Sequence, residues 1–204
     1  MTSVITKSLL TVMTMASMTA FGASKLESGK YNIDPMHSKV GFEIPHLMIS
    51  SVDGKFNTFS GVITIDSNFT KSSLQADADI ASIDTGVTKR DDHLKSADFF
   101  DAAKYPKMTF KSTSITGNAE SFKAVGDLTI KGTTKKVTFD GKYTGSAVDG
   151  YGNTKAAFAA TTKISRKDFG LTYNQMVEAG PVVGNEVTIS LKIQGALEKA
   201  PVKK

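Results

Sequence analysis

Hydrophobic and polar residues alternate with a period of two along most of this chain. In the segment 187–193, valine, isoleucine and leucine are separated one by one by threonine, serine and lysine. The same alternation occurs in the segments 40–44, 74–80, 122–130, 137–139 and 158–164. Strands of this kind have one face in water and one face in the core, as in antiparallel sheets.

Turn residues separate these strands at short intervals. Glycine, asparagine and aspartate mark turns at Ser67–Asn68, Gly117–Asn118, Lys131–Gly132 and Asp149–Asn153. Asp53–Gly54 fits either a further turn or a bulge in a bent strand. Because no internal repeat or linker divides the chain, we predict one all-β domain of about eight strands, built as a sandwich or a barrel.

The segment 85–110 breaks the alternation. Its charged residues predict a short helix whose start is capped by Asp91 or Asp92. Phe99 and Phe100 follow this helix. The segment is interpreted either as a plug or lid at the mouth of a barrel, or as a surface connection whose phenylalanines complete the core.

The two ends of the chain differ from the middle. Residues 1–22 predict a cleavable secretory signal peptide, because an apolar run that is too short to span a bilayer ends in the small-residue site Ala20–Gly22. The folded domain is then expected to span residues 23–198, and residues 199–204 to form a basic tail. We therefore expect an exported protein.

Composition narrows the classes of function. The chain has no cysteine, which excludes thiolate catalysis and thiolate zinc sites. Its net charge of +5 is mild and evenly spread, which argues against nucleic-acid binding.

Several inward positions carry small residues. They are Ala76, Ala78, Ala124, Gly126 and Ala160. Small and large residues can alternate to fit the taper of a filled barrel, or the small residues can leave an internal apolar tunnel.

A series of motifs resembles the YceI-like family, in the order that the family has. The motifs are DPMHSKVGFEIPHL at 34–47, VDGKFNTFSG at 52–61, ASIDTG at 81–86, RDDHLKS at 90–96, DFFD at 98–101, YP at 105–106, GDLTIKGTTKKV at 126–137, RKDFGL at 166–171 and VGNEV at 183–187. Together they cover the chain from about residue 30 to residue 196. Tyr173 is one departure, since tryptophan is frequent at this position in the family.

The resemblance implies an extended, lipocalin-like antiparallel β-barrel with one or two short helical segments. It also implies that the lumen binds a polyisoprenoid or a similar long-chain lipid, often in the bacterial periplasm. We therefore expect a non-enzymatic protein without a cofactor, which carries, stores or sequesters a long-chain isoprenoid or fatty amphiphile. Transient membrane contact and a homodimer are compatible with this interpretation, whereas nucleic acid is not an expected partner.

The expected ligand contacts come from the inward strand faces and from the segment 85–110. The predicted lining or plug consists of Val40, Phe42, Ile44, Phe56, Phe59, Leu74, Ala76, Ala78, Ile80, Leu94, Phe99, Phe100, Met108, Phe110, Leu128, Ile130, Val137 and Phe139. His46, Arg90 and His93 are candidates either for contact with a ligand head group or for structural hydrogen bonds and charge pairs.

The histidines also support an alternative from another class of function. His37, His46 and His93 would serve a periplasmic metal-dependent hydrolase. No metal-ligand spacing such as H-x-H or H-E-x-x-H supports this alternative, and no G-x-S-x-G elbow offers a serine nucleophile. The sequence therefore favours the binding protein.

A second cluster of charges, Arg166 and Asp168, precedes Gly170. We expect these charges to close another strand end of the barrel. Gly170 is suited to a positive φ angle there.

Overall fold

The computed structural model describes residues 25–177 and 180–199. The expected signal peptide and all but the first residue of the expected basic tail lie outside the described residues. The strands are β1 (Gly29–Ile33), β2 (Lys39–His46), β3 (Ser50–Phe56), β4 (Phe59–Ile65), β5 (Ser73–Asp79), β6 (Ile83–Asp84), β7 (Lys107–Asn118), β8 (Ser121–Ile130), β9 (Thr133–Val148), β10 (Thr154–Ser165), β11 (Met176–Val177), β12 (Gly180–Pro181) and β13 (Glu186–Leu197). These bounds place each alternating segment in a strand, except that β5 ends one residue earlier than predicted.

Helical structure is limited to short segments. They are α1 (Thr88–Lys95) and the 3-10 turns η1 (Pro35–His37), η2 (Phe69–Lys71), η3 (Ile80–Ser82) and η4 (Arg166–Phe169). Within the described residues, no helix is long and apolar enough to cross a membrane.

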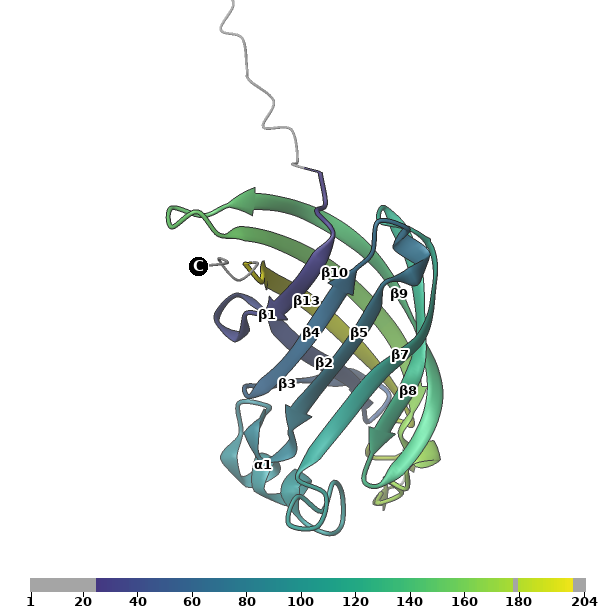
Figure 1. Cartoon of the computed structure of the whole chain (residues 1–204). Helices are drawn as coiled ribbons and strands as arrows, with labels where there is room; N and C mark the ends of the chain where they lie inside the picture. Colours follow the sequence, from purple (N-terminus) through teal and green to yellow (C-terminus); the bar gives the residue numbers. More distant parts are fainter. Residues whose placement is uncertain (1–24, 178–179, 200–204) are drawn as a thin grey trace, which may run out of the picture.

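Eight antiparallel strands of the described chain close into a ring, which confirms the predicted barrel (Figure 1). Their order is β1, β4, β5, β7, β8, β9, β10 and β13. The ring closes because β1 also pairs with β13, where Tyr31 lies opposite Leu197. α1 lies at one end of the barrel, and the hairpin between β9 and β10 lies at the other end.

The last strand, β13, changes its partner along its length. Residues 195–197 pair with β1, whereas residues 188–192 pair with β2, which follows β1 after the turn η1. β2 forms a hairpin with β3, and β3 pairs with the two-residue strand β6. The small sheet of β2, β3 and β6 therefore extends the barrel wall beyond the closed ring.

The prediction of a turn or bulge at Asp53–Gly54 is wrong. Both residues lie inside β3, and they pair in unbroken register with Glu43 and Phe42 of β2. Glycine is needed at position 54 for a different reason. A Cβ atom on Gly54 would come within 2.2 Å of the Phe42 ring. Gly54 therefore allows the Phe42 ring to lie against the neighbouring strand.

The small inward residues serve both of the purposes left open by the sequence. A Cβ atom on Gly126 would come within 2.4 Å of the Phe110 ring, so this glycine makes room for a large neighbour. The alanines line an internal cavity: Ala76, Ala78, Ala124 and Ala160. The barrel is thus filled around Gly126 and hollow beside the alanines.

The predicted short helix is present as α1, but neither aspartate caps its start. The helix begins at Thr88, and its N-cap residue Val87 makes no side-chain cap. Asp91 lies in the first turn and accepts hydrogen bonds from the backbone N and the Oγ1 of Thr85 at 2.9 and 2.5 Å. Because the chain folds back before the helix, the Asp91 carboxylate holds the preceding loop instead.

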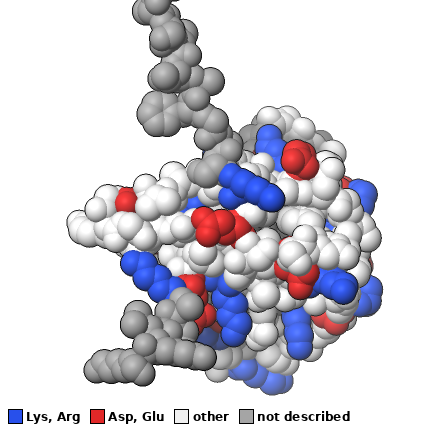
Figure 2. Space-filling model, turned by 45° about the horizontal axis from the view of Figure 1, so that its top comes forward, with Lys and Arg blue, Asp and Glu red and all other residues white. Residues whose placement is uncertain are grey.

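Acidic and basic side chains alternate over the outside of the barrel. Figure 2 shows them interspersed on one face. Several pairs link neighbouring strands, such as Lys107 of β7 with Asp77 of β5 at 2.8 Å and Lys136 of β9 with Asp127 of β8 at 3.1 Å. The hydrogen bond from Lys107 lowers the pKa of Asp77, and a hydrogen bond from Ser60 acts in the same direction.

Replacing Asp77 with asparagine is expected to lower the free energy of unfolding at pH 7 by about 0.5–1 kcal/mol. Because the folded-state pKa of Asp77 is lowered, its stabilising contribution is complete above the unfolded pKa of about 3.9 and disappears as the pH falls through the folded pKa. Urea unfolding at pH 7 and at about pH 2 should therefore show a difference between variant and parent only at the higher pH.

Glu120→Gln is the matched control, since Glu120 is an exposed turn residue that forms no ion pair with any described residue. An equal loss of stability for Asp77→Asn at both pH values would show that the carboxylate charge is not the cause.

Candidate functional site

An outer and an inner cavity lie inside the described barrel. The outer cavity has a volume of about 360 Å³ and lies at the end where α1 is found. The inner cavity has a volume of about 140 Å³. Val40 of β2, Met108 of β7 and Ile189 of β13 line both cavities, so the two cavities adjoin at these three side chains, which we call the waist.

Most of the predicted ligand-contacting residues line one of these cavities. The outer cavity is lined by Val40, Phe42, Ile44, His46, Phe56, Arg90, His93, Leu94, Phe99, Phe100, Met108 and Ile130. The inner cavity is lined by Phe59, Leu74, Ala76, Ala78, Phe110, Leu128 and Phe139, together with Val40 and Met108. Their contact with a ligand stays a prediction.

Two of the predicted lining residues, Ile80 and Val137, line neither cavity. β5 ends at Asp79, and Ile80 begins the turn η3, where it is 1% exposed and packs against the core around Phe56. Val137 lies on β9 opposite Gly126 and packs against the buried cluster around Phe110. Both residues therefore belong to the packed wall.

The sequence prediction missed a group of lining residues from β10, β13 and the loop that joins them. For the outer cavity they include Ile164, Arg166, Leu171, Tyr173, Val183, Val187 and Ile189. The inner cavity adds Phe158, Leu191 and Ile193, together with Ile115 of β7 and Phe122 of β8. The alternation along 158–164 and 187–193 contained the signal for the strand residues. No local pattern indicated the loop residues.

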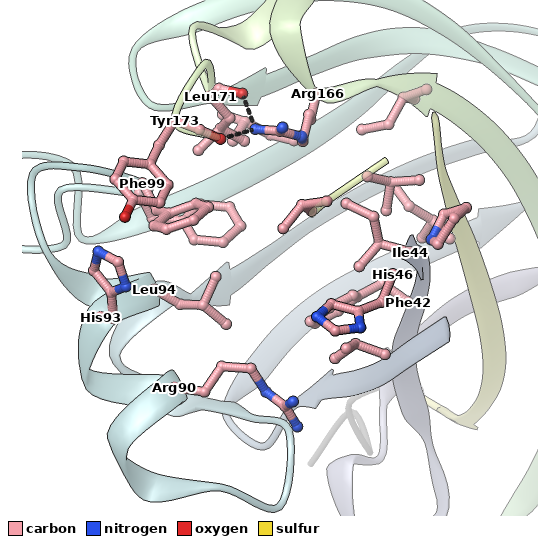
Figure 3. A pocket seen from close by; sticks show the side chains of 18 of the residues that line it. Phe42, Ile44, His46, Arg90, His93, Leu94, Phe99, Arg166, Leu171 and Tyr173 are labelled. Atoms are coloured by element: carbon pink, nitrogen blue, oxygen red, sulfur yellow. Dashed lines mark hydrogen bonds between the residues drawn. The ribbon is translucent and has the colours of Figure 1, made fainter. Parts of the chain in front are cut away.

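Arg166 holds this loop against the end of the barrel (Figure 3). Its side chain is buried, with only 3% exposure. Nε donates a hydrogen bond to the carbonyl oxygen of Gly184 at 2.8 Å, and Nη1 donates to the carbonyl oxygens of Leu171 and Tyr173 at 2.6 and 2.8 Å. Burial lowers the pKa of Arg166. The turn before Leu171 has Gly170 at φ 75°, which confirms the expected positive φ.

An aromatic cluster joins this loop to the segment after α1. The rings of His93, Phe99 and Tyr173 lie about 5 Å apart in all three pairings, at 5.1, 5.0 and 4.9 Å between centroids. Nε2 of His93 also lies 2.9 Å from Oδ2 of Asp98. Tyr173, the departure from the family pattern, thus fills an aromatic position between the two segments that cover the outer cavity.

The segment 85–110 has the geometry of a plug. Phe99 is 9% exposed and Phe100 lies edge-on to Phe56, with 6.2 Å between their ring centroids. Both phenylalanines and Leu94 line the outer cavity while they also pack against buried core residues. The two interpretations of this segment therefore combine, because it completes the core and covers the cavity with the same side chains.

The three histidines do not converge. His37 pairs with Asp34 at 2.9 Å, whereas His93 pairs with Asp98 and His46 lines the outer cavity. The described residues contain no group of three His, Cys, Asp or Glu side chains that is placed to hold a metal ion. The arrangement of the three histidines gives the hydrolase alternative no support.

Arg90 lies on the opposite side of the outer cavity from Arg166 (Figure 3). It projects from α1, and its Nε and Nη2 donate hydrogen bonds to Oγ1 and to the carbonyl oxygen of Thr85 at 2.7 and 2.9 Å. Thr85 is also held by Asp91, so these three residues fix the start of the plug segment.

A closed antiparallel barrel with an apolar lumen defines the class of small barrels that enclose a ligand cavity. The model of the YceI-like domain matches residues 31–195, and the chain belongs to this family. Protein YceI of Escherichia coli O6:H1 is 38% identical over 196 residues, which cover 95% of this chain and 99% of that protein.

Solved structures show the same fold. BcnA of Burkholderia cenocepacia has a TM-score of 0.70 and 27% identity, covering 79% of this chain and 98% of its own. A polyisoprenoid binding domain from Saccharophagus degradans, implicated in plant cell wall breakdown, has a TM-score of 0.58 over 84% of this chain and all of its own. Its identity is 15%, so this likeness concerns the fold alone.

Proposed function

We propose that this protein binds a polyisoprenoid or a similar long-chain amphiphile inside the barrel, for carriage, storage or sequestration, without catalysing a reaction. The observation that carries the proposal is the pair of adjoining cavities, whose lining is largely aliphatic and aromatic. A chain that threads the waist uses both cavities, whereas a compact ligand would fill only one. A protein of the same fold is a polyisoprenoid binding domain, which supports the proposal.

We further propose that the protein acts in the periplasm. The support comes from residues 1–22, which have the features of a cleavable secretory signal. A chain without cysteine needs no oxidising compartment, so its stability in the periplasm rests on burial of its core.

The energetics favour exchange with a membrane over permanent storage. Burying a tail of ~20 carbons is worth roughly 16 kcal/mol relative to water, at about 0.8 kcal/mol for each CH₂ group. Association and tail ordering offset several kcal/mol to more than ten. A bilayer offers the tail the same apolar surroundings, so the hydrophobic contribution nearly cancels when the lipid moves from membrane to barrel. Shape and polar contacts must then determine which lipid is bound.

Organic extraction of the purified protein tests this function. The full chain should be expressed with its own N-terminal segment, purified without detergent and extracted for mass spectrometry. We expect one class of long-chain isoprenoid or fatty amphiphile in an amount that approaches one molecule per barrel. A protein that carries no such lipid and also fails to bind added geranylgeraniol would overturn the proposal.

A further inference from the structure

The charged side chains that line the outer cavity are basic. Among the described lining residues these are Arg90 and Arg166, accompanied by His46 and His93, and none is acidic. The inner cavity has no basic residue in its described lining, and its one acidic residue, Asp77, directs its carboxylate to Lys107 and Ser60. The lumen is therefore polarised, with its cationic groups at the end where α1 lies.

Arg166 carries a donor group that the described protein does not use. Its Nε and Nη1 donate to three loop carbonyls, but Nη2 is buried and has no acceptor among the described residues. A buried donor on a charged group is unfavourable when it is left unpaired. The loop carbonyls thus accept hydrogen bonds from only two of the three nitrogen atoms of this guanidinium.

Neither arginine has a carboxylate partner in the described chain. The ion pairs found there do not include Arg90 or Arg166. Asp91 is linked to Arg90 through Thr85, whose Oγ1 donates to Asp91 and accepts from Arg90, and Asp98 pairs with His93. Asp91 therefore offsets part of the charge of Arg90, whereas the described hydrogen bonds of Arg166 all go to carbonyl groups.

We infer that the ligand has an acidic head group, a carboxylate or a phosphate, that occupies the outer cavity. Its oxygens accept hydrogen bonds from Nη2 of Arg166, and Arg90 contributes positive charge from the opposite side (Figure 3). The tail passes the waist at Val40, Met108 and Ile189 into the inner cavity. This inference rests on the proposed function, because it places the head group of the same lumen-bound lipid.

The two arginines differ in accessibility. Arg90 is half-buried, whereas Nη2 of Arg166 is covered by its neighbours, so an oxygen reaches it only when a lining side chain shifts. The head group is expected to meet Arg90 first and Arg166 last. Arg166 then changes its environment only when an acidic ligand is fully seated.

Three probes with the same tail test the head-group chemistry. Geranylgeranyl phosphate, geranylgeranoic acid and geranylgeraniol should be titrated into the delipidated protein by calorimetry. We expect the two acids to bind roughly 10- to 100-fold tighter than the alcohol. The ratio between the two acids then distinguishes a phosphate from a carboxylate ligand. Equal affinities for acids and alcohol would overturn the inference but keep the proposed function, whereas a failure of all three probes to bind would contradict both.

Arginine variants test whether Arg90 and Arg166 cause the preference for acidic ligands. Arg90→Gln and Arg166→Gln should each lower the ratio of acid affinity to alcohol affinity by about tenfold, because a loss of loop contacts affects all three probes alike whereas the loss of charge affects only the acids. Lys167→Gln is the matched control, because Lys167 is exposed beside Arg166 and loses the same charge. A full acid preference in both arginine variants would contradict the inference.

A measurement on the parent protein covers the case in which Arg166→Gln does not fold. The NMR signal of the Arg166 Nε–H group should shift when geranylgeranyl phosphate is added and stay in place with geranylgeraniol. A signal that responds alike to both ligands would show that Arg166 has no part in head-group binding.

Discussion

Ala78→Phe is expected to weaken binding of a long-chain lipid by roughly 100-fold. Ala78 is 4% exposed, lines the inner cavity and lies opposite Phe59 and Met108 on the neighbouring strands. An engineered cavity of about 150 Å³ holds one benzene molecule, so a phenyl ring fills the 140 Å³ available here. If the ring displaces about four CH₂ groups of the tail from the cavity, the binding free energy becomes weaker by about 3 kcal/mol. This corresponds to the roughly 100-fold weaker binding.

Calorimetry with geranylgeranyl and short-chain amphiphiles separates the two cavities. The short chain needs only the outer cavity and should bind the variant almost as well as the parent. Ala147→Phe makes the same change at an exposed position of β9 and should leave both affinities unchanged. Parental affinity of Ala78→Phe for the long chain would show that the tail does not enter the inner cavity.

Tyr31→Ala is expected to lower the free energy of unfolding by about 3–5 kcal/mol. The Tyr31 side chain is fully buried and packs with Ile65, Ala156 and Phe158. This is a large share of the roughly 5–15 kcal/mol that stabilises a typical domain. Tyr31 also lies on β1, the strand that closes the ring against β13, so the cavity left by alanine would weaken the barrel at its point of closure.

Tyr31→Phe is the matched control. It removes only the hydroxyl group, which donates a hydrogen bond to the carbonyl oxygen of Glu27 at 2.9 Å, and should cost about 0.5–1.5 kcal/mol. Urea unfolding of both variants gives the comparison. Equal losses for the two variants would assign the contribution of Tyr31 to its hydrogen bond and contradict the packing argument.

The class of fold was predictable because it depends on a periodic pattern. The alternation along 187–193 requires a strand with one dry face, and β13 has that form. The choice of a barrel over a sandwich came from the resemblance to a family, since alternation alone does not specify how a sheet closes. Pairing of β1 with β13 joins the two ends of the domain, and no local pattern records it.

The candidate site was predictable where it depends on strand faces and unpredictable where it depends on loops. Phe42 and Ala78 follow from alternation, whereas Ile80 fails because the chain leaves β5 just before it. Arg166 was noticed as a charge at a strand end, but its role depends on carbonyl groups up to 18 positions away in the sequence. Asp91 likewise holds a loop that folds back from outside the helix, which a cap rule does not anticipate.

The pairing of the first strand of the ring with the last has a consequence for the order of folding. Tyr31 finds its partner Leu197 only when nearly the whole chain is available, so the ring cannot close until synthesis has reached β13. Such distant pairing makes folding slow and leaves strand edges open until the last step. The lumen therefore comes into existence only after β13 has been made and has found β1.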